Sequence, residues 1–168
     1  MADQPPPYAP HRARLATPIG VVELLGDDRA LHRVTIIPDD SEPTSIDAPR
    51  GSPVAMAVDQ LEEYFDGRRR VFDVPLAPIP SPRGAVLRRA ITSVGYGETQ
   101  SYGAVARRFD SAARAMGQAC ARNPFPIIVP CHRVTSAGGA KENYSGGAGI
   151  VTKAWLNAHE AQHRESAP

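Results

Sequence analysis

The sequence predicts a mixed α/β protein (α+β) in two parts that differ in secondary structure. Residues 13–37 consist of short apolar runs separated by turn signals, a pattern typical of β-strands. From about residue 83 onward, apolar side chains recur instead at helical spacing. Between the two parts, the segment PLAPIPSPRG holds four prolines in ten residues, which indicates a linker. We therefore expect a small sheet-containing part followed by a mainly helical part.

The N-terminal part contains three expected strands, one expected helix and a further strand candidate. ARLATPIGVVELLG has a Pro-Ile-Gly turn between two apolar runs, and ALHRVTIIP is a third run. SPVAMAVDQLEEYFDG is expected to be helical, because Ser52 can cap it, Pro53 suits its first turn and Gly67 can end it. VFDV, at 71–74, is the further strand candidate. Residues 1–12 hold four prolines and are expected to form a disordered tail.

The C-terminal part is expected to consist of short helices. AVLRRAITSV places five apolar residues on one side of a helix: Val86, Leu87, Ala90, Ile91 and Val94. SYGAVARRF can be capped by Ser101, and SAARAMGQACARN can be capped by Ser111. Two short helices joined by a tight turn predict a helix-turn-helix.

Charge is unevenly distributed along the chain. The formal net charge is only +1, so the protein as a whole is not a basic nucleic-acid binder. From Arg83 to Arg133, however, there are eight arginines and only two acidic residues. Such a segment can neutralise phosphates, although an ordinary solvated face would look the same.

Composition also bears on the compartment. The N-terminus lacks the apolar region of a signal peptide, and no apolar run approaches a membrane span of about 18 residues. The two cysteines, Cys120 and Cys131, cannot build a disulfide framework. We expect a reduced, cytoplasmic location, no membrane partner and a free thiol.

The segment PIIVPCHRV singles out Cys131 as a candidate nucleophile. His132 follows it directly and cannot easily reach its neighbour's sulfur, but a bridging water could connect them. A base needs an orienting group, and Glu160 in WLNAHEA is the candidate carboxylate. Core packing of a Cys-His pair is the alternative interpretation. The cysteines and His132 lack zinc-ligand spacing, so we expect no metal and no cofactor.

Several segments together resemble one known family. RNPFPIIVPCHRV, NYSGG and AWLNAHE, with YGETQSYGAVA and AARAMG upstream, resemble the O6-alkylguanine-DNA alkyltransferases, and TPIG near the N-terminus also recurs there. The resemblance is strongest from about Tyr96 to Glu160. It implies a ribonuclease-H-like domain at 13–78, an alkyl-acceptor and DNA-binding domain at 83–162, and a tail at 163–168.

The resemblance implies direct-reversal DNA repair. An alkyl group would move irreversibly from O6 of guanine to Cys131, so that each molecule acts once. His132 would serve as a water-mediated base oriented by Glu160, which fits the logic of an activated thiol. Arg133 would be structural, paired with an acidic residue.

The resemblance also implies how DNA would be held. The helix-turn-helix would bind the minor groove of duplex DNA, and Arg114 would fill the space of a flipped base. Neighbouring DNA-binding positions would be Ala112, Ala113, Gly117 and Arg122. The partner would be duplex DNA carrying O6-alkylguanine, bound by a monomer.

The base pocket follows from the same resemblance. Tyr102 would donate to guanine N3 as a general acid. Asn123 would be the hinge between the recognition helix and the active-site turn. Tyr144 would wall the base, the Ser145 backbone would face O6, and the Val134 carbonyl would accept from the exocyclic amine.

Three departures from the family pattern are visible. Arg88 stands where the family has a tryptophan. Tyr102 and Arg114 are 12 residues apart, closer than in the family. Glu142 places a charge in the active-site loop, where it would repel a phosphate.

Two other functions remain open from the sequence. One is a non-catalytic damage-binding protein, since alkyltransferase-like proteins share this scaffold but lack the reactive cysteine. The other is a cysteine hydrolase using Cys131 and His132, although such enzymes usually draw the histidine from a distant part of the chain.

Overall fold

A computed structural model describes residues 9–137 and 143–165. The chain divides into two compact units between Ala77 and Pro78, which falls within the proline-rich segment expected to be a linker. The division into an antiparallel sheet unit and a mainly helical unit confirms the predicted α+β class.

The N-terminal unit is built on a four-stranded antiparallel sheet of order β3-β2-β1-β4. Its strands are β1 (His11–Thr17), β2 (Gly20–Gly26), β3 (Leu31–Ile37) and β4 (Ser45–Asp47). The turn at Pro18 and Ile19 joins β1 to β2 as predicted, and Gly20 adopts a φ of +108°. The expected tail at 1–12 was too long, because His11 already pairs with Gly26 in the ladder. Residues 1–8 of that tail lie outside the described residues.

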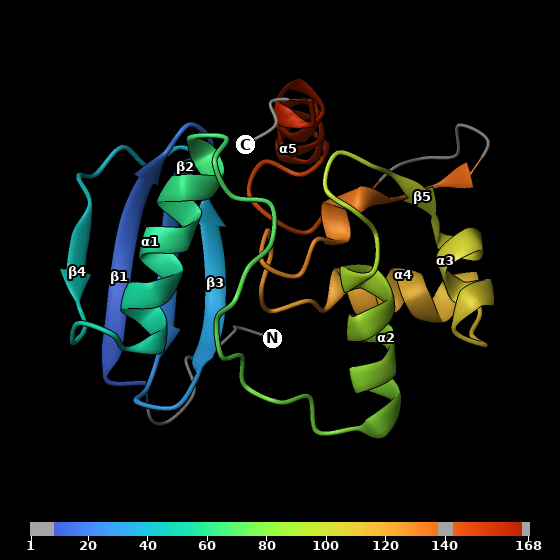
Figure 1. The fold of residues 1–168 in the computed structure, drawn as a ribbon, viewed down its shortest axis with the longest axis horizontal. Coiled ribbons are helices and arrows are strands. Elements are labelled where there is room, and N and C mark those ends of the chain that lie inside the picture. Colours follow the sequence, from blue (N-terminus) through green and yellow to red (C-terminus); the bar gives the residue numbers. More distant parts are fainter. Residues whose placement is uncertain (1–8, 138–142, 166–168) are drawn as a thin grey trace. The chain divides into compact units, whose positions relative to one another are not determined.

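Helix α1 (Pro53–Phe65) packs across one face of this sheet (Figure 1). The predicted cap is confirmed: the Ser52 hydroxyl accepts from the Ala55 backbone N–H at 3.3 Å. Gly67, at a φ of +76°, follows the end of the helix, where a left-handed backbone favours glycine. The buried side of α1 thus completes the core of the unit with Val54, Leu61 and Tyr64, all fully buried.

The strand predicted at 71–74 does not form. The side-chain amide of Gln60 binds both backbone groups of Asp73, accepting from its N–H at 2.8 Å and donating to its carbonyl at 3.1 Å. Leu76 makes only an isolated bridge with Leu31. A glutamine from α1 therefore takes the hydrogen bonds that a neighbouring strand would have needed.

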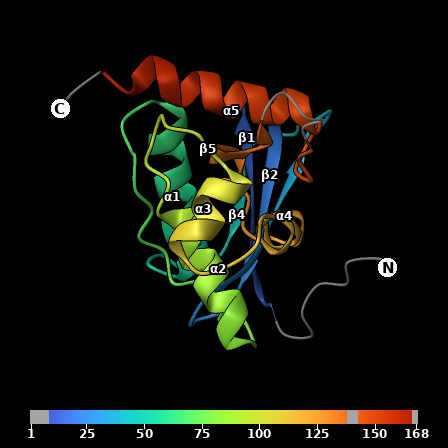
Figure 2. The ribbon, with the colours of Figure 1, turned by 90° about the vertical axis from the view of Figure 1, so that its right-hand side faces the viewer.

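The C-terminal unit contains four α-helices among its described residues, together with a short parallel strand pair and a 3-10 turn. The elements are α2 (Pro82–Thr92), β5 (Gln100–Ser101), α3 (Tyr102–Arg108), α4 (Ala113–Ala121), η1 (Cys131–Arg133), β6 (Val134–Thr135) and α5 (Ile150–His163). In Figure 2, α5 runs as one unbroken helix above α2, α3 and α4. It ends one residue inside the tail expected at 163–168.

Helices α3 and α4 form the predicted pair of short helices. The Ser101 cap is confirmed, because its hydroxyl accepts from the Ala104 N–H at 3.1 Å. The second predicted cap is wrong: α4 begins after Ala112, and Ser111 makes no side-chain cap. Asp110 adopts a φ of +50°, and the Ser111 N–H bonds back to the Ala106 carbonyl at 2.9 Å. The connection thereby uses Ser111 to end α3 rather than to begin α4.

The apolar run before Cys131 forms a turn. The Val129 N–H donates to the Phe125 carbonyl at 2.9 Å, closing residues 125–129. Glu142, expected in the active-site loop, lies outside the described residues. Among the helices of the described part, none combines the length and the apolar character needed to cross a membrane.

Candidate active site

Cys131 begins the 3-10 turn η1 and is 3% exposed. The side-chain amide of Asn123 donates to its sulfur at 3.2 Å and to the Val129 carbonyl at 2.9 Å. The Asn123 oxygen accepts from the Phe125 N–H at 2.9 Å. One asparagine, just after the end of α4, therefore ties the following turn and the thiol together.

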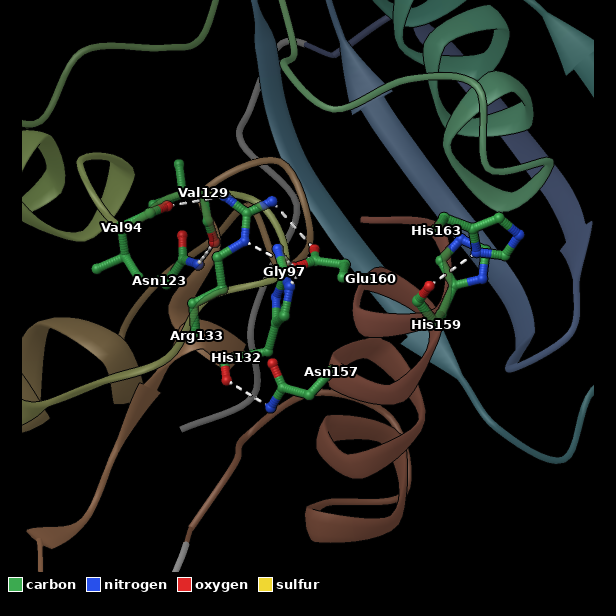
Figure 3. A network of polar contacts seen from close by, with 10 residues as sticks. All are labelled: Val94, Gly97, Asn123, Val129, His132, Arg133, Asn157, His159, Glu160 and His163. Atoms are coloured by element: carbon green, nitrogen blue, oxygen red, sulfur yellow. Dashed lines mark hydrogen bonds and ion pairs between the residues drawn. The ribbon is translucent and has the colours of Figure 1, made fainter. Parts of the chain in front are cut away.

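His132 and Glu160 meet in the interior, although 28 residues separate them in sequence. His132 Nε2 lies 2.7 Å from Glu160 Oε1, and both side chains are fully buried (Figure 3). The Gly97 N–H also donates to Glu160, at 3.2 Å, and Asn157 donates to the His132 carbonyl at 2.9 Å. The structure thus brings His132 to the carboxylate that the sequence suggested for it.

Arg133 completes this network. Its Nε donates to Glu160 Oε2 at 2.9 Å and its Nη2 to Oε1 at 3.0 Å, a bidentate pairing. A third donation, from Nη1, reaches the Val94 carbonyl at 2.9 Å, just beyond the end of α2. The guanidinium also lies 5.6 Å from the centre of the Tyr96 ring. Its expected acidic partner is thus the same Glu160 that binds His132.

The network fixes the charge states of its members. Burial alone raises the pKa of Glu160, but hydrogen bonds from His132 and Arg133 outweigh it and lower that pKa to about 2. Burial lowers the pKa of His132, which outweighs the opposing effect of Glu160. At neutral pH, a neutral His132 therefore donates its Nε2–H to an ionised Glu160. His132 Nδ1 is then a lone-pair acceptor, and it is buried without a hydrogen-bond partner among the described residues.

The thiol itself is held back from ionising. Burial raises the pKa of Cys131, while the Asn123 hydrogen bond and the charge of Lys153 oppose that effect. A protonated resting thiol with an internal base in the next residue fits a nucleophile that is activated only during reaction.

A cavity of about 190 Å³ opens beside the thiol. It is lined by Tyr102, Gly117, Cys120, Ala121, Cys131, Asn143, Tyr144 and Ser145. The structure thereby brings together the predicted acceptor, general-acid and wall residues. The Tyr144 hydroxyl is buried with no hydrogen-bond partner in the described part of the chain, and burial raises the pKa of that phenol well above its ordinary value. Val134 does not line this cavity.

Lys153 is a candidate that the sequence analysis missed. It lies on α5, is 2% exposed, and donates to the Val134 carbonyl at 2.8 Å. Its ammonium lies 5.9 Å from the centre of the Tyr102 ring. The Val134 carbonyl, predicted to accept a hydrogen bond from the guanine amine, therefore already accepts one from Lys153, and its second lone pair remains for the base. No local signal distinguishes Lys153 from a surface lysine, because its burial depends on where α5 packs.

Cys120 is the second cysteine beside this cavity and lies near the C-terminal end of α4. It is 7% exposed and lines the cavity together with Cys131. Burial raises the pKa of Cys120 to about 12, so it remains a thiol at neutral pH. Both cysteines are free.

The predicted DNA-binding residues lie on or beside α4. Arg114 is in the first turn of the helix and Arg122 is at its C-terminal end, and both are exposed. Ala112 and Ala113 are exposed at the start of α4, whereas Gly117 faces the cavity. The arginines are therefore accessible, whereas Cys131, His132 and Glu160 are buried.

Arg88, the departure from a family tryptophan, has a structural role. Its guanidinium lies 5.0 Å from the centre of the Phe125 ring, at the start of the turn that leads to Cys131. The guanidinium of Arg88 thus makes a cation–π contact with Phe125. Among the described residues, no cluster of three or more His, Cys, Asp or Glu side chains is arranged to hold a metal ion.

The fold and the site together define a class of protein. It has a pair of short helices that bears exposed arginines, and a buried cysteine that lies beside a small cavity. A histidine and a carboxylate form a hydrogen-bonded network next to that cysteine. The particular family follows from comparison. Two family models match, "6-O-methylguanine DNA methyltransferase, ribonuclease-like domain" over residues 11–78 and "6-O-methylguanine DNA methyltransferase, DNA binding domain" over residues 84–162.

Individual proteins agree with this match. A methylated-DNA–protein-cysteine methyltransferase of Mycolicibacterium paratuberculosis is 38% identical over 88% of this chain and 90% of its own. The mouse protein of the same name is 35% identical over 87% of this chain and 79% of its own. The crystal structure of the Mycobacterium tuberculosis O6-methylguanine methyltransferase superposes with a TM-score of 0.75 at 34% identity, covering 94% of each chain. The chain belongs to the 6-O-methylguanine DNA methyltransferase family.

Proposed function

We propose that this protein performs direct-reversal DNA repair by transferring an alkyl group from O6 of guanine to the sulfur of Cys131. Transfer from alkylated DNA to a protein cysteine is the activity of the relatives, which are similar to this chain over most of its length. A DNA complex of the Mycobacterium tuberculosis protein, with a TM-score of 0.72 at 32% identity over 89% of this chain and 92% of its own, supports DNA as the partner.

The observation that carries the proposal is the arrangement around Cys131. A buried thiol lines a cavity, and the adjacent His132 has a buried, unpartnered Nδ1 while its Nε2 is bonded to Glu160. In the proposed step, a bridging water takes the thiol proton to Nδ1. The sulfur then attacks the alkyl carbon, a sulfur–carbon bond forms, and the carbon–O6 bond breaks with its electron pair passing to the guanine.

The departing guanine must be neutralised. We assign Tyr102 as the general acid that donates its hydroxyl proton to guanine N3. The Lys153 ammonium near the Tyr102 ring stabilises the resulting phenolate, which regains a proton from the His132 imidazolium. The products are a neutral guanine and a thioether on Cys131. A thioether is not hydrolysed, so each molecule would act once.

The target base has to leave the DNA stack to reach a thiol that is 3% exposed. Arg114 would occupy the vacated space, with Ala112, Ala113 and Arg122 along the same minor-groove surface. Tyr144 and Ser145 would contact the flipped base in the cavity, with the Val134 carbonyl accepting from its amine. Asn123 would hold the thiol against the recognition helix.

The decisive experiment is intact-mass spectrometry after mixing the protein with a duplex that contains O6-methylguanine. We expect one methyl group per wild-type molecule and none on Cys131→Ala, which should still bind the duplex. Unchanged wild-type mass at protein excess, with binding retained, would instead assign the protein to the non-catalytic damage sensors. Steady turnover of an ester or peptide would point to a hydrolase.

We further propose a monomer in a reducing, cytoplasmic compartment. Two free buried cysteines support the reducing compartment, since disulfides are rare there. A single chain contains every group named above, so the reaction needs no second copy. Sedimentation of the protein with and without DNA would test the monomer.

A further inference from the structure

Ile127 lies midway along the chain between the end of α4 and Cys131, and its backbone φ angle is unusual. Its φ is +75°, in the left-handed region, while its side chain is completely buried. Apart from Asp110, it is the one non-glycine residue of the described part with a positive φ. A β-branched residue is strongly disfavoured in that region, where glycine is the usual choice. Strained backbone of this kind clusters at functional sites.

The strained residue sits inside a closed set of hydrogen bonds. The turn from Phe125 to Val129 is closed by the Val129 N–H donating to the Phe125 carbonyl at 2.9 Å. Asn123 binds both ends of this turn. Its side chain donates to the Val129 carbonyl (Figure 3) and accepts from the Phe125 N–H. The Cys131 N–H also donates to that carbonyl, at 2.8 Å. The path of the backbone at Ile127 therefore determines whether the Val129 carbonyl and the Cys131 sulfur can both face the side-chain amide of Asn123.

A glycine at 127 would remove the strain but would also remove the anchor. The Ile127 side chain, like that of Phe125, belongs to the largest fully buried groups of the protein. Arg88 covers the Phe125 ring from outside. The buried side chain thus holds the turn in place while the left-handed backbone sets its path.

We propose that Ile127 is a positioning residue for alkyl transfer: its buried side chain locks a left-handed turn that aims the Cys131 sulfur at the Asn123 amide. This inference rests on Cys131 being the acceptor. The Asn123 hydrogen bond favours the thiolate, so any loosening of the turn reduces both the rate and the ease of ionisation. DNA binding uses the exposed face of α4 and is unaffected.

The test compares alanine with glycine at two buried isoleucines, Ile127 and Ile91, and asks which of the two replacements is tolerated better at each position. Ile91 is 1% exposed in the regular helix α2 and serves as the matched control. In a helix, alanine is tolerated better than glycine. At 127 the order reverses, because alanine disfavours a positive φ and no longer has a large side chain to enforce it, whereas glycine accepts that φ freely. Ile127→Val keeps the branched anchor and is expected to react like wild type.

The measurement is the single-turnover rate of methyl transfer as a function of pH, at a temperature where each variant is folded. We expect Ile127→Ala to be slower on the order of tenfold to a hundredfold. Its pH midpoint should move to higher pH, with Ile127→Gly intermediate. Ile91→Ala and Ile91→Gly should keep the wild-type rate and midpoint, and duplex affinity should be unchanged throughout.

Three results would overturn the inference. The first is a faster methyl transfer by Ile127→Ala than by Ile127→Gly, and the second is an unmoved pH midpoint in both of these variants. The third is a shift of the pH midpoint in the Ile91 variants that equals the shift in the Ile127 variants. If Ile127→Ala does not fold, Ile127→Gly is compared with Ile127→Val instead. Equal transfer rates and equal pH midpoints in these two variants would then overturn the inference. Wild-type transfer to Cys131 is measured first. Its absence would remove the proposed function, whereas its presence with unaltered 127 variants would remove only the role of Ile127.

Discussion

The acceptor network and the α3–α4 surface lie in the same unit but differ in how their charges are treated. In the network, the Glu160 carboxylate receives hydrogen bonds from His132, Arg133 and Gly97 and is fully buried. On the surface, Arg114 and Arg122 are exposed. Buried charges must be fully paired because desolvation is costly, whereas exposed arginines remain available for phosphates or a displaced base.

This contrast teaches that stability and chemistry are linked in the network and separable on the surface. Removing one member of a buried ion pair strands its partner, so both folding and reaction should suffer. Exposed arginines can be removed with little effect on folding. Substitutions in the two regions should therefore differ in how far folding and reaction change together.

The largest effect is expected from Glu160→Gln. The change removes the charge that Arg133 and His132 share, so we expect the free energy of unfolding to fall by about 3–5 kcal/mol and methyl transfer to be nearly lost. Urea unfolding and single-turnover kinetics measure the two effects. Glu98→Gln is the control, because the exposed Glu98–Arg164 pair at 4.0 Å should contribute less than about 1 kcal/mol. Equal losses in the two variants would contradict the special role of the buried network.

Acidification should unfold the protein through the same network. The folded pKa values of His132 and Glu160 are both lowered, so the unfolded chain binds more protons and stability falls as pH falls. The contribution of His132 is present above its ordinary pKa of 6.5 and declines below it. That of Glu160 is present above 4.5 and is lost progressively towards about 2. Thermal unfolding between pH 7 and 3 measures this, and Glu160→Gln should flatten the acidic part.

Lys153→Met tests whether a buried cation assists the thiol. The charge of Lys153 lowers the pKa of Cys131, so we expect the pH–rate curve to move to higher pH and the rate at neutral pH to fall about tenfold. Lys153→Arg keeps the charge and should shift the curve less. A Met variant with both an unmoved curve and an unchanged rate would limit Lys153 to its contact with the Val134 carbonyl.

Arg114→Ala tests the exposed surface. We expect repair of O6-methylguanine in duplex DNA to slow at least tenfold, because flipping a base costs a few kcal/mol, while reaction with the free alkylated base is unchanged. The free energy of unfolding should change by less than about 0.5 kcal/mol. Equal slowing on both substrates would exclude the base-displacing role, and Arg107→Ala, also exposed on the helix pair, gives the effect of losing a charge alone.

The smallest effect is expected from Cys120→Ala. Burial raises the pKa of both thiols, and both line the same cavity, but it is the Cys131 sulfur that accepts a hydrogen bond from Asn123 and is followed directly by His132. We expect a transfer rate within about threefold of wild type and a stability loss of about 1 kcal/mol from the shortened side chain. Peptide mass mapping should place the alkyl group on Cys131 alone. Alkyl found on Cys120 would show that the acceptor had been assigned to the wrong residue.

Much of the local structure was determined by the sequence. Ser52 and Ser101 cap helices as predicted, because a cap needs only its own hydroxyl and the next turn of backbone. The motif around Cys131 and the AWLNAHE segment were enough to name the family and to pair His132 with Glu160. These features depend on residues close in the chain or on a recognisable set of motifs.

Tertiary structure decided the rest, because the deciding contacts join distant residues. Gln60 captures the backbone at Asp73 and prevents the strand expected at 71–74. Packing of α5 buries Lys153 next to Val134, and burial gives Ile127 the anchoring needed for a left-handed backbone that its own preferences oppose. Local propensity cannot register a hydrogen bond or a desolvated charge that exists only after the chain has folded.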